Sequence, residues 1–435
     1  MATQVRSALA AFTASLALFL PVAGQTPATG NVKAFVGATL VDGTGGPPLP
    51  DAVIVVRDQR IVAVGPAKTT PVPAGATRID VAGRTIVPGM INSHGHIGST
   101  FGLESGAAQN TAENVQRQLA LNARYGITTV VSLGDDREPG FAARDGNEKP
   151  DIDRARLHVA GPVITAKTPD EARAAVDAAA KLNPDWIKIR VDDNLGSTAK
   201  MTPEVYTAVI EQAHKHKLRV AAHLYYLDDA KGLLRAGVDL IAHSIRDAPV
   251  DTELTALMKA RNVCLSPTLM REVSTFVYET RPAFFDDPFF RKEADPKIVA
   301  TLEEPARQAS MASSKSAQTY KTSLEVARRN VKALYDAGIR LASGTDSGPP
   351  ARFQGYFEHL ELEELVKSGL TPSAALVAAT GNAASCMGLA DRVGTIQQGR
   401  SADLIVLSKS PLEDVKNSRT IESVWISGNR VPAAR

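Results

Sequence analysis

The sequence predicts an α/β fold, a (β/α)8 TIM barrel joined to a small β-sandwich domain that is built from both chain ends. Short apolar runs alternate with amphipathic helical segments between residues 88 and 390. Alternating β-branched segments occur instead near the two ends of the chain. With 435 residues, the chain is long enough for one large and one small domain. A doubly wound open sheet is the competing architecture for the middle of the chain.

Residues 1–24 have the pattern of a secretory signal peptide. Arg6 supplies one early positive charge, an apolar run extends from Ala8 to Leu20, and Pro21 and small residues follow. This run is too short to span a bilayer as a stable anchor. We therefore expect cleavage, a mature chain that starts near Gln25, and a secreted or periplasmic protein with no stable membrane span. An uncleaved anchor is the alternative.

Residues 25–87 and 391–435 are expected to form the β-sandwich. The first range contains "KAFVGATLVDGTG" and "DAVIVVRDQRIVAVG", and the second contains "VGTIQQGRSADLIVLS" and "IESVWISGNRV". These are alternating β-branched runs interrupted by Gly and Asp, a pattern typical of short strands and turns. Since the pattern returns only at the C-terminal end, both ends are expected to contribute to one domain.

The middle of the chain, residues 88–390, is expected to form the barrel. Its predicted strands are Met90–His96, Thr128–Leu133, Leu157–Ala160, Trp186–Arg190, Arg219–His223, Leu240–His243, Val263–Pro267 and Leu341–Asp346. Helical segments between them carry apolar residues at i, i+3 and i+4. Thr202-Pro203 and Thr371-Pro372 are typical of an N-cap followed by proline in the first helical turn.

A segment of about 70 residues, roughly 269–335, is too long for an ordinary connection between a strand and a helix. Its first part is rich in aromatic residues: Phe276, Tyr278, Phe284, Phe285, Phe289 and Phe290. Two interpretations remain open. The segment is either a lid or pocket wall that accepts a bulky apolar substrate group, or a subunit interface or separate small core.

Residues that can bind a metal or move a proton occupy equivalent positions on the predicted strands. They are His94, His96, Lys188, His223, His243 and Asp346. Residues two apart on a strand point to the same face, so the two histidines of "HGH" are expected to project together. The carboxyl ends of barrel strands converge on one face, which predicts one shared pocket. His214 and His216 lie instead in a helical segment, where side chains two apart diverge, and are interpreted as solvated.

The motifs "PGMINSHGH", "WIKIRVDD", "VAAHLYY", "LIAHS", "LASGTDSG" and "AATGNAASCMGLADRVGTIQQGRSADLIVL" resemble the amidohydrolase superfamily, in particular its prolidase-like and imidazolonepropionase-like branch. The similarity covers essentially all of the expected mature chain. The resemblance implies two divalent metal ions, usually zinc. It implies His94, His96 and Asp346 on one ion, His223 and His243 on the other, and Lys188, carbamylated by CO2, bridging both.

The resemblance also implies a mechanism in which a metal-bound hydroxide attacks the scissile carbonyl and Asp346 transfers the proton to the leaving nitrogen. A lysine fits the bridging position for a chemical reason. A buried ammonium group would repel cations, but a lysine whose pKa is lowered by burial can react with CO2 as the free amine. The resulting carbamate is a carboxylate-like ligand.

Departures from the branch concern the substrate. Asn92 stands where the branch often has Asp. Arg190 faces the same side as Lys188 if the strand continues, so it either holds a substrate carboxylate or pairs with Asp192 or Asp193.

Aromatic candidates for substrate contact follow the fifth strand and the eighth. Tyr225 matches a position where similar peptidases carry a substrate-contacting tyrosine, and its neighbour Tyr226 is an equal candidate. His359 follows the eighth strand and is a further candidate for substrate binding or for a place just behind the ligands.

The composition excludes some classes of function. The formal net charge is +2, which gives no reason to expect a nucleic-acid partner. Cys264 and Cys386 lack CxxC spacing and imply no zinc-thiolate site, and whether they pair is left open by the sequence. Homo-oligomer formation is also left open.

We therefore expect a secreted, binuclear metal-dependent hydrolase that cleaves an amide bond in a small molecule, either a peptide or an N-acyl amino acid with a bulky hydrophobic group. Hydrolysis of lactones, cyclic amides or phosphotriesters is the first alternative, because the same nucleophile attacks all of them. A non-catalytic scaffold is the remote alternative.

Overall fold

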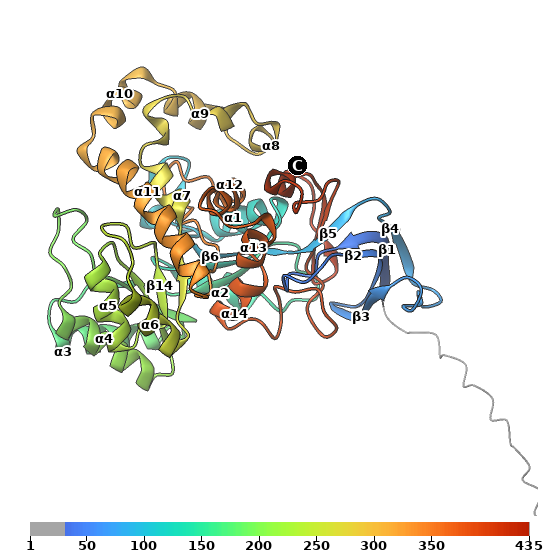
Figure 1. The fold of residues 1–435 in the computed structure, drawn as a ribbon, viewed down its shortest axis with the longest axis horizontal. Helices are drawn as coiled ribbons and strands as arrows, with labels where there is room; N and C mark the ends of the chain where they lie inside the picture. Colours follow the sequence, from blue (N-terminus) through green and yellow to red (C-terminus); the bar gives the residue numbers. More distant parts are fainter. Residues whose placement is uncertain (1–30, 435) are drawn as a thin grey trace, which may run out of the picture.

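The computed structural model describes residues 31–434 (Figure 1). The predicted signal peptide, residues 1–24, lies outside the described residues. Among the helices of the described part, none is both long enough and apolar enough to cross a membrane.

Strands from both ends of the chain form one sheet. In residues 31–434 this sheet has eight strands, with the order β18-β17-β16-β5-β1-β2-β3 and with β4 paired to β1. The strands are β1 (Val32–Leu40), β2 (Leu49–Arg57), β3 (Arg60–Pro66), β4 (Thr77–Asp80), β5 (Thr85–Pro88), β16 (Leu404–Leu407), β17 (Ile421–Ile426) and β18 (Asn429–Arg430). The antiparallel pairing of β5 with β16 joins the N-terminal strands to the C-terminal strands. Phe35 and Trp425 pack edge to face across this junction, with ring centroids 5.1 Å apart.

The middle of the chain contains two parallel sheets. One has the order β10-β9-β6 and the other β11-β12-β13-β14-β15. Their strands are β6 (Met90–Gly95), β9 (Ile127–Ser132), β10 (Arg156–Val159), β11 (Val163–Ile164), β12 (Trp186–Arg190), β13 (Arg219–His223), β14 (Leu240–Ala242) and β15 (Cys264–Ser266). Single backbone contacts join the sheets: Leu265 bridges to Leu341, Gly95 bridges to Ser347, and the Asp185 N–H donates to the Val159 carbonyl.

The predicted strand Leu341–Asp346 is therefore not a regular strand. It makes only the isolated bridge at Leu341, and Asp346 has a φ of 55°, in the left-handed region, which is incompatible with continued strand pairing. A short hairpin that we did not expect, β7 (Thr100–Phe101) with β8 (Glu104–Ser105), follows β6.

Helices alternate with the parallel strands and surround them (Figure 1). They are α1 (Ala112–Arg124), α2 (Glu138–Asp145), α3 (Pro169–Ala180), α4 (Pro203–Lys215), α5 (Leu227–Ala236), α6 (Thr252–Arg261), α12 (Tyr356–Lys367), α13 (Pro372–Ala378) and α14 (Gly381–Met387), with the 3-10 turns η1 (Ala107–Gln109) and η4 (Val415–Arg419). The Thr371 side chain caps α13 by accepting the Ala374 N–H, as predicted. Thr202 holds the N-cap position of α4, but its side chain makes no capping hydrogen bond.

The long insertion is mainly helical and projects from the rest of the molecule, as the yellow to orange segment at the top of Figure 1 shows. It contains α7 (Leu269–Ser274), η2 (Val277–Glu279), η3 (Ala283–Asp286), α8 (Pro288–Arg291), α9 (Pro296–Leu302), α10 (Pro305–Ser313) and α11 (Lys315–Asp336).

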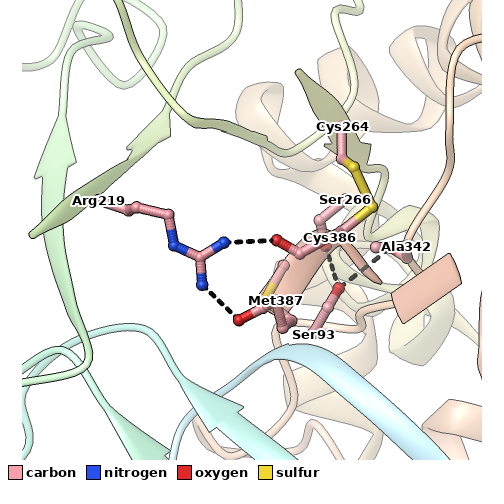
Figure 2. Close-up of a disulfide and its surroundings, with 7 residues drawn as sticks. All are labelled: Ser93, Arg219, Cys264, Ser266, Ala342, Cys386 and Met387. Atoms are coloured by element: carbon pink, nitrogen blue, oxygen red, sulfur yellow. Dashed lines mark hydrogen bonds between the residues drawn. A yellow bond between two sulfur atoms is a disulfide. The ribbon is translucent and has the colours of Figure 1, made fainter. Parts of the chain in front are cut away.

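Cys264 and Cys386 form a disulfide, with their Cα atoms 6.0 Å apart (Figure 2). The bond joins the first residue of β15 to α14, which are 122 positions apart in the sequence. Arg219, from β13, donates hydrogen bonds to the carbonyl oxygens of Cys386 and Met387. The end of α14 is therefore fixed to two parallel strands.

Candidate metal centre

His94, in β6, and His96, which directly follows that strand, both project towards Asp346, as the alternation of extended backbone predicts. The His96 Nε2 atom lies 2.8 Å from Asp346 Oδ1, and the His94 Nε2 atom lies 3.5 Å from the same oxygen. The other ring nitrogen of His96 contacts the Gly134 carbonyl oxygen at 3.2 Å. One carboxylate thus faces both histidines.

Glycine permits the close approach of the Asp346 loop to β6. A Cβ atom on Gly344 would lie 2.8 Å from the His94 backbone nitrogen, and one on Gly348 would lie 2.2 Å from the His96 carbonyl oxygen. Gly348 also has a φ of 113°. The glycines of "GTDSG" are therefore required by the distance between this loop and the histidine strand.

Lys188 lies in β12 with its Nζ atom 3.1 Å from His94 Nε2. Its side chain is buried, and burial lowers its pKa to about 7. Near neutral pH much of this lysine is therefore the free amine, which is the form that reacts with CO2.

His223 and His243 complete the group of predicted ligands. Their ring centroids are 4.2 Å apart, and those of His243 and His94 are 4.6 Å apart. The His243 Nδ1 atom contacts Thr268 Oγ1 at 2.6 Å, and the His223 Nε2 atom contacts Asp192 Oδ2 at 2.8 Å. Such contacts orient a ring and determine which nitrogen keeps its lone pair.

The electrostatics of the group fit metal ligands. Burial lowers the pKa of His94 and His243 well below the usual value, so both rings are neutral. Within residues 31–434, the buried atoms His94 Nδ1 and His243 Nε2 have no hydrogen-bond partner. His94, His243 and Asp346 each place one ligand atom so that these atoms lie within 4.8 Å of one another. A divalent cation would satisfy groups that are otherwise costly to bury.

A cavity of about 730 Å³ opens above these residues. Its charged and ligand-type lining residues are His94, His96, His223, Lys188, Arg137, Arg190, Arg271, Arg352, Asp135 and Asp346. Cationic side chains outnumber acidic ones in this lining. The cavity is therefore suited to a substrate with an anionic group.

Comparison with known proteins decides the family. The model of the amidohydrolase family matches residues 85–431. This chain belongs to the amidohydrolase family. It is therefore an enzyme, a hydrolase, and the resemblance seen in its motifs is confirmed.

The individual relatives of this amidohydrolase share low sequence identity with it. An uncharacterized protein of Mycobacterium tuberculosis is 26% identical over 371 residues, which cover 83% of this chain and 88% of that protein. Ochratoxinase of Aspergillus niger is 26% identical over 281 residues, which cover 62% of this chain and 51% of that protein. The crystal structure of a candidate prolidase from Bifidobacterium longum superposes with a TM-score of 0.75 at 26% identity, covering 93% of this chain and 96% of that one.

Arg190 of this amidohydrolase was predicted either to hold a substrate carboxylate or to pair with Asp192 or Asp193, and its position is compatible with both roles. It lines the cavity, and its Nε–H donates to Asp192 Oδ1 at 3.3 Å. The carboxylate of Asp192 is shared with His223, so Arg190 and His223 are oriented by one acidic group.

Tyr225 and Tyr226 are outside the lining of the cavity in the described structure. The Tyr225 hydroxyl is 2.5 Å from Ser323 Oγ, in α11, and the Tyr226 hydroxyl donates to Asp193 Oδ1 at 2.8 Å. Each phenol oxygen therefore contacts the protein rather than the cavity.

His359 does not belong to the site. It is buried in α12, where its Nε2–H donates to the Tyr125 carbonyl oxygen at 2.8 Å and its Nδ1 contacts Ser418 Oγ at 2.9 Å. Both ring nitrogens are satisfied, so the ring has no free atom for a substrate. Its position eleven residues beyond "GTDSG", in the same helix as a buried glutamate, Glu358, did not reveal the direction in which it points.

The aromatic residues of the insertion do not line the cavity either. Phe290 is 1% exposed, and its ring centroid lies 4.8 Å from that of Phe353 and 5.0 Å from that of Tyr356. Phe284 and Phe285 pack against the same group. The described structure therefore matches neither a pocket wall nor a separate small core, because these rings join the main hydrophobic core.

Some residues of the site were not anticipated from the sequence. Arg352 pairs with Asp346, and Arg271 and Arg137 line the cavity. Each lies on a loop or short helix beyond a strand end, and an arginine there has no periodic signal. Only its position in the sequence after the carboxyl end of a strand could have suggested it.

Proposed function

We propose that this chain is a secreted amidohydrolase with a binuclear divalent metal centre, most simply zinc, that cleaves the amide bond of a peptide or an N-acyl amino acid. The observation that carries the proposal is the convergence of His94, His243 and Asp346, with Lys188 beside His94. His94, Lys188 and Asp346 also line the cationic cavity. Ochratoxinase and prolidase, to which the chain is similar, are hydrolases of amide bonds.

The ligand chemistry supports this assignment. His94, His96 and Asp346 would hold one ion, His223 and His243 the other, and Lys188 as its carbamate would bridge them. When bound, such ions supply Lewis-acid chemistry, lowering the pKa of water and polarising a carbonyl oxygen.

Asp346 is suited to move the proton. Burial alone would raise its pKa, but Arg352 and the neighbouring histidines hold that pKa well below the usual value. The carboxylate is therefore ionised at neutral pH and able to accept a proton at Oδ1 or Oδ2. Transfer of that proton to the leaving nitrogen would complete amide cleavage.

Arginines at the cavity favour a substrate with a carboxylate. Among the described residues Arg137 makes no ion pair, and Arg190 uses only its Nε in the contact with Asp192. The terminal nitrogens of a guanidinium form two parallel hydrogen bonds with a carboxylate. A bulky apolar substrate group is not part of this proposal, because the aromatic rings that suggested it pack into the main hydrophobic core and do not line the cavity.

We also propose a barrel with a β-sandwich domain as the architecture of the protein, and export as its location. The two parallel sheets, joined by single backbone contacts, would act as one barrel that brings the strand ends together, and the terminal sheet would form the β-sandwich. The disulfide supports export, since disulfides persist mainly in oxidising compartments.

Parallel assays of the purified protein test the reaction. We expect hydrolysis of N-acyl amino acids, with weaker cleavage of the corresponding N-acyl carboxamides, whose neutral end cannot pair with Arg190. Faster turnover of lactones or phosphotriesters than of any amide would replace the proposed substrate class with that alternative.

Substitution of the lysine tests the metal bridge. We expect Lys188→Ala to lose bound metal and to reduce kcat/KM by about a hundredfold or more, because a bridging ligand is missing. A short carboxylic acid added to the buffer should restore part of both. Metal content is measured by elemental analysis.

Lys181→Ala, which changes an exposed lysine, is the matched control and should keep its metal and its rate. Unchanged metal content and turnover in Lys188→Ala would remove the bridging role.

A further inference from the structure

The side chain of Asn92 connects the two segments that carry His94 and Asp346. Asn92 lies in β6 and is 2% exposed. Its Oδ1 atom accepts the backbone N–H of His94 at 3.0 Å and the backbone N–H of Thr345 at 3.3 Å. One amide oxygen thus fixes the distance between the histidine strand and the aspartate loop.

The other end of the Asn92 amide faces a buried carboxyl group. Its Nδ2–H2 group lies 2.6 Å from Glu358 Oε1, 3.1 Å from Thr345 Oγ1 and 3.3 Å from Ser347 Oγ. Both hydroxyls also donate to Glu358 Oε1, at 3.0 Å from Thr345 and 2.7 Å from Ser347. A single oxygen of Glu358, which projects from α12, therefore accepts from three donors.

The residues held in this way flank Asp346 on both sides. Asp346 has a φ of 55°, which residues other than glycine seldom adopt. Its N–H donates to the His94 carbonyl oxygen at 2.7 Å, and the Ser347 N–H donates to Thr345 Oγ1 at 3.1 Å. A backbone conformation of this kind persists only where its surroundings determine it.

We propose that Asn92 and Glu358 are paired positioning residues of the metal centre, which hold Asp346 at its ligand position relative to His94. The proposal rests on the proposed function, since it concerns the same site. Neither residue lines the cavity in the described structure, so each acts through the ligands that it orients.

The donor and acceptor pattern predicts which substitutions the pair tolerates. Asn92→Asp would place a carboxylate oxygen against Glu358 Oε1, so two acceptors would face each other in a buried site. Adding Glu358→Gln would remove the repulsion, because the amide can donate to the new carboxylate and the two hydroxyls can turn towards it. Glu358→Gln alone keeps an oxygen that can accept the three donors.

Cobalt binding to the full-length protein tests this pair. The metal-free protein is titrated with Co²⁺, and affinity is measured together with the visible absorption spectrum, which reports ligand geometry. We expect Asn92→Asp to weaken Co²⁺ binding by about tenfold or more and to alter the spectrum. We expect Glu358→Gln to stay within about threefold of the wild type, and the double variant to return to that range.

Asn122→Asp is the matched control. Asn122 is 1% exposed in α1, and its Nδ2–H donates to the Gln118 carbonyl oxygen, away from the site. This change also buries a new carboxylate, so it should lower the melting temperature without weakening Co²⁺ binding. If Asn92→Asp does not fold, Thr345→Val, which keeps the side-chain shape and loses the hydroxyl, is expected to weaken Co²⁺ binding by about tenfold.

Wild-type affinity in Asn92→Asp or, where that variant does not fold, in Thr345→Val would overturn the proposal. A double variant as weak as Asn92→Asp alone would also overturn it. Failure of the positioning proposal can be told apart from failure of the proposed function. If the wild-type protein binds Co²⁺ but hydrolyses no amide, only the proposed reaction is refuted. A wild-type protein that binds no Co²⁺ overturns both.

Discussion

His243 and His359 are both 1% exposed, and burial lowers the pKa of both rings. Their hydrogen bonds differ. His359 has a partner at each nitrogen, whereas His243 Nε2 has none among the described residues. The unpartnered nitrogen leaves His243 a lone pair for a cation, whereas the His359 ring has no nitrogen left for one. Burial by itself therefore does not separate the two roles.

The structural role of His359 predicts a pH dependence of stability. Burial lowers the pKa of His359 to about 3, while an unfolded histidine has a pKa near 6.5. The folded state therefore resists protonation, so the stability contributed by the neutral ring is fully present above about pH 6.5 and is lost as the pH falls towards 3. The loss from this group approaches about 1.4 kcal/mol per pH unit within that window.

Denaturant unfolding of the wild type and of His359→Gln between pH 7.5 and pH 5 measures this contribution. The variant cannot take up the proton, so its free energy of unfolding should fall less steeply with decreasing pH. The two proteins are compared by the slope of the free energy of unfolding against pH. This comparison removes the pH-independent cost of the substitution and the contribution of the other histidines, which both proteins share. Equal slopes in the two proteins would show that His359 is accessible to protons in the folded state.

At the scale of elements, the insertion between β15 and the Asp346 loop contributes to the cavity only near its start. Arg271 of α7 lines the cavity, but the aromatic residues that follow pack against α12. The same α12 carries Glu358, whose carboxyl group contacts both hydroxyls beside Asp346. The aromatic core therefore supports the helix behind the site instead of covering its opening.

Phe290→Ala distinguishes a core from a lid. We expect a loss of about 3–5 kcal/mol in the free energy of unfolding, because the ring is fully buried among other rings. KM for the substrate should not change, since the side chain does not line the cavity. Phe101→Ala, which removes a ring that is 55% exposed, is the comparison and should change stability little. A large rise in KM with unchanged stability would restore the lid interpretation.

At the scale of the whole molecule, contacts between distant parts of the chain close the structure. The β5–β16 pairing joins its two ends, and the disulfide joins β15 to α14. Loop closure over 122 positions removes many conformations from the unfolded chain, which is how a disulfide stabilises the folded state in the chain-entropy account.

Replacing both cysteines tests this contribution. We expect the variant with Cys264→Ala and Cys386→Ala to lose about 2–5 kcal/mol in the free energy of unfolding. Dithiothreitol should lower the melting temperature of the wild type and leave that of the double variant unchanged. An identical melting temperature for oxidised and reduced wild type would show that the disulfide adds nothing to stability.

The sequence by itself determined the α/β class and the family, and it predicted the ligand-type residues. These follow from local patterns: alternation in "HGH" puts two histidines on one face, and periodic strands and helices set the order of the elements. The shared face of a strand is a property of neighbouring residues, so it can be recognised without the fold.

Only the tertiary structure decided which polar side chains meet. Arg352 reaches Asp346, His359 turns towards Tyr125 and Ser418, and Cys264 pairs with Cys386. The aromatic residues form a core, and Asn92 meets Glu358 across 266 positions. Such contacts depend on the packing of elements far apart in sequence and on the rotation of a helix about its axis. Contacts between distant elements leave no periodic pattern in the residues, and α12 is buried on most sides, so it has no single apolar face that would predict its rotation.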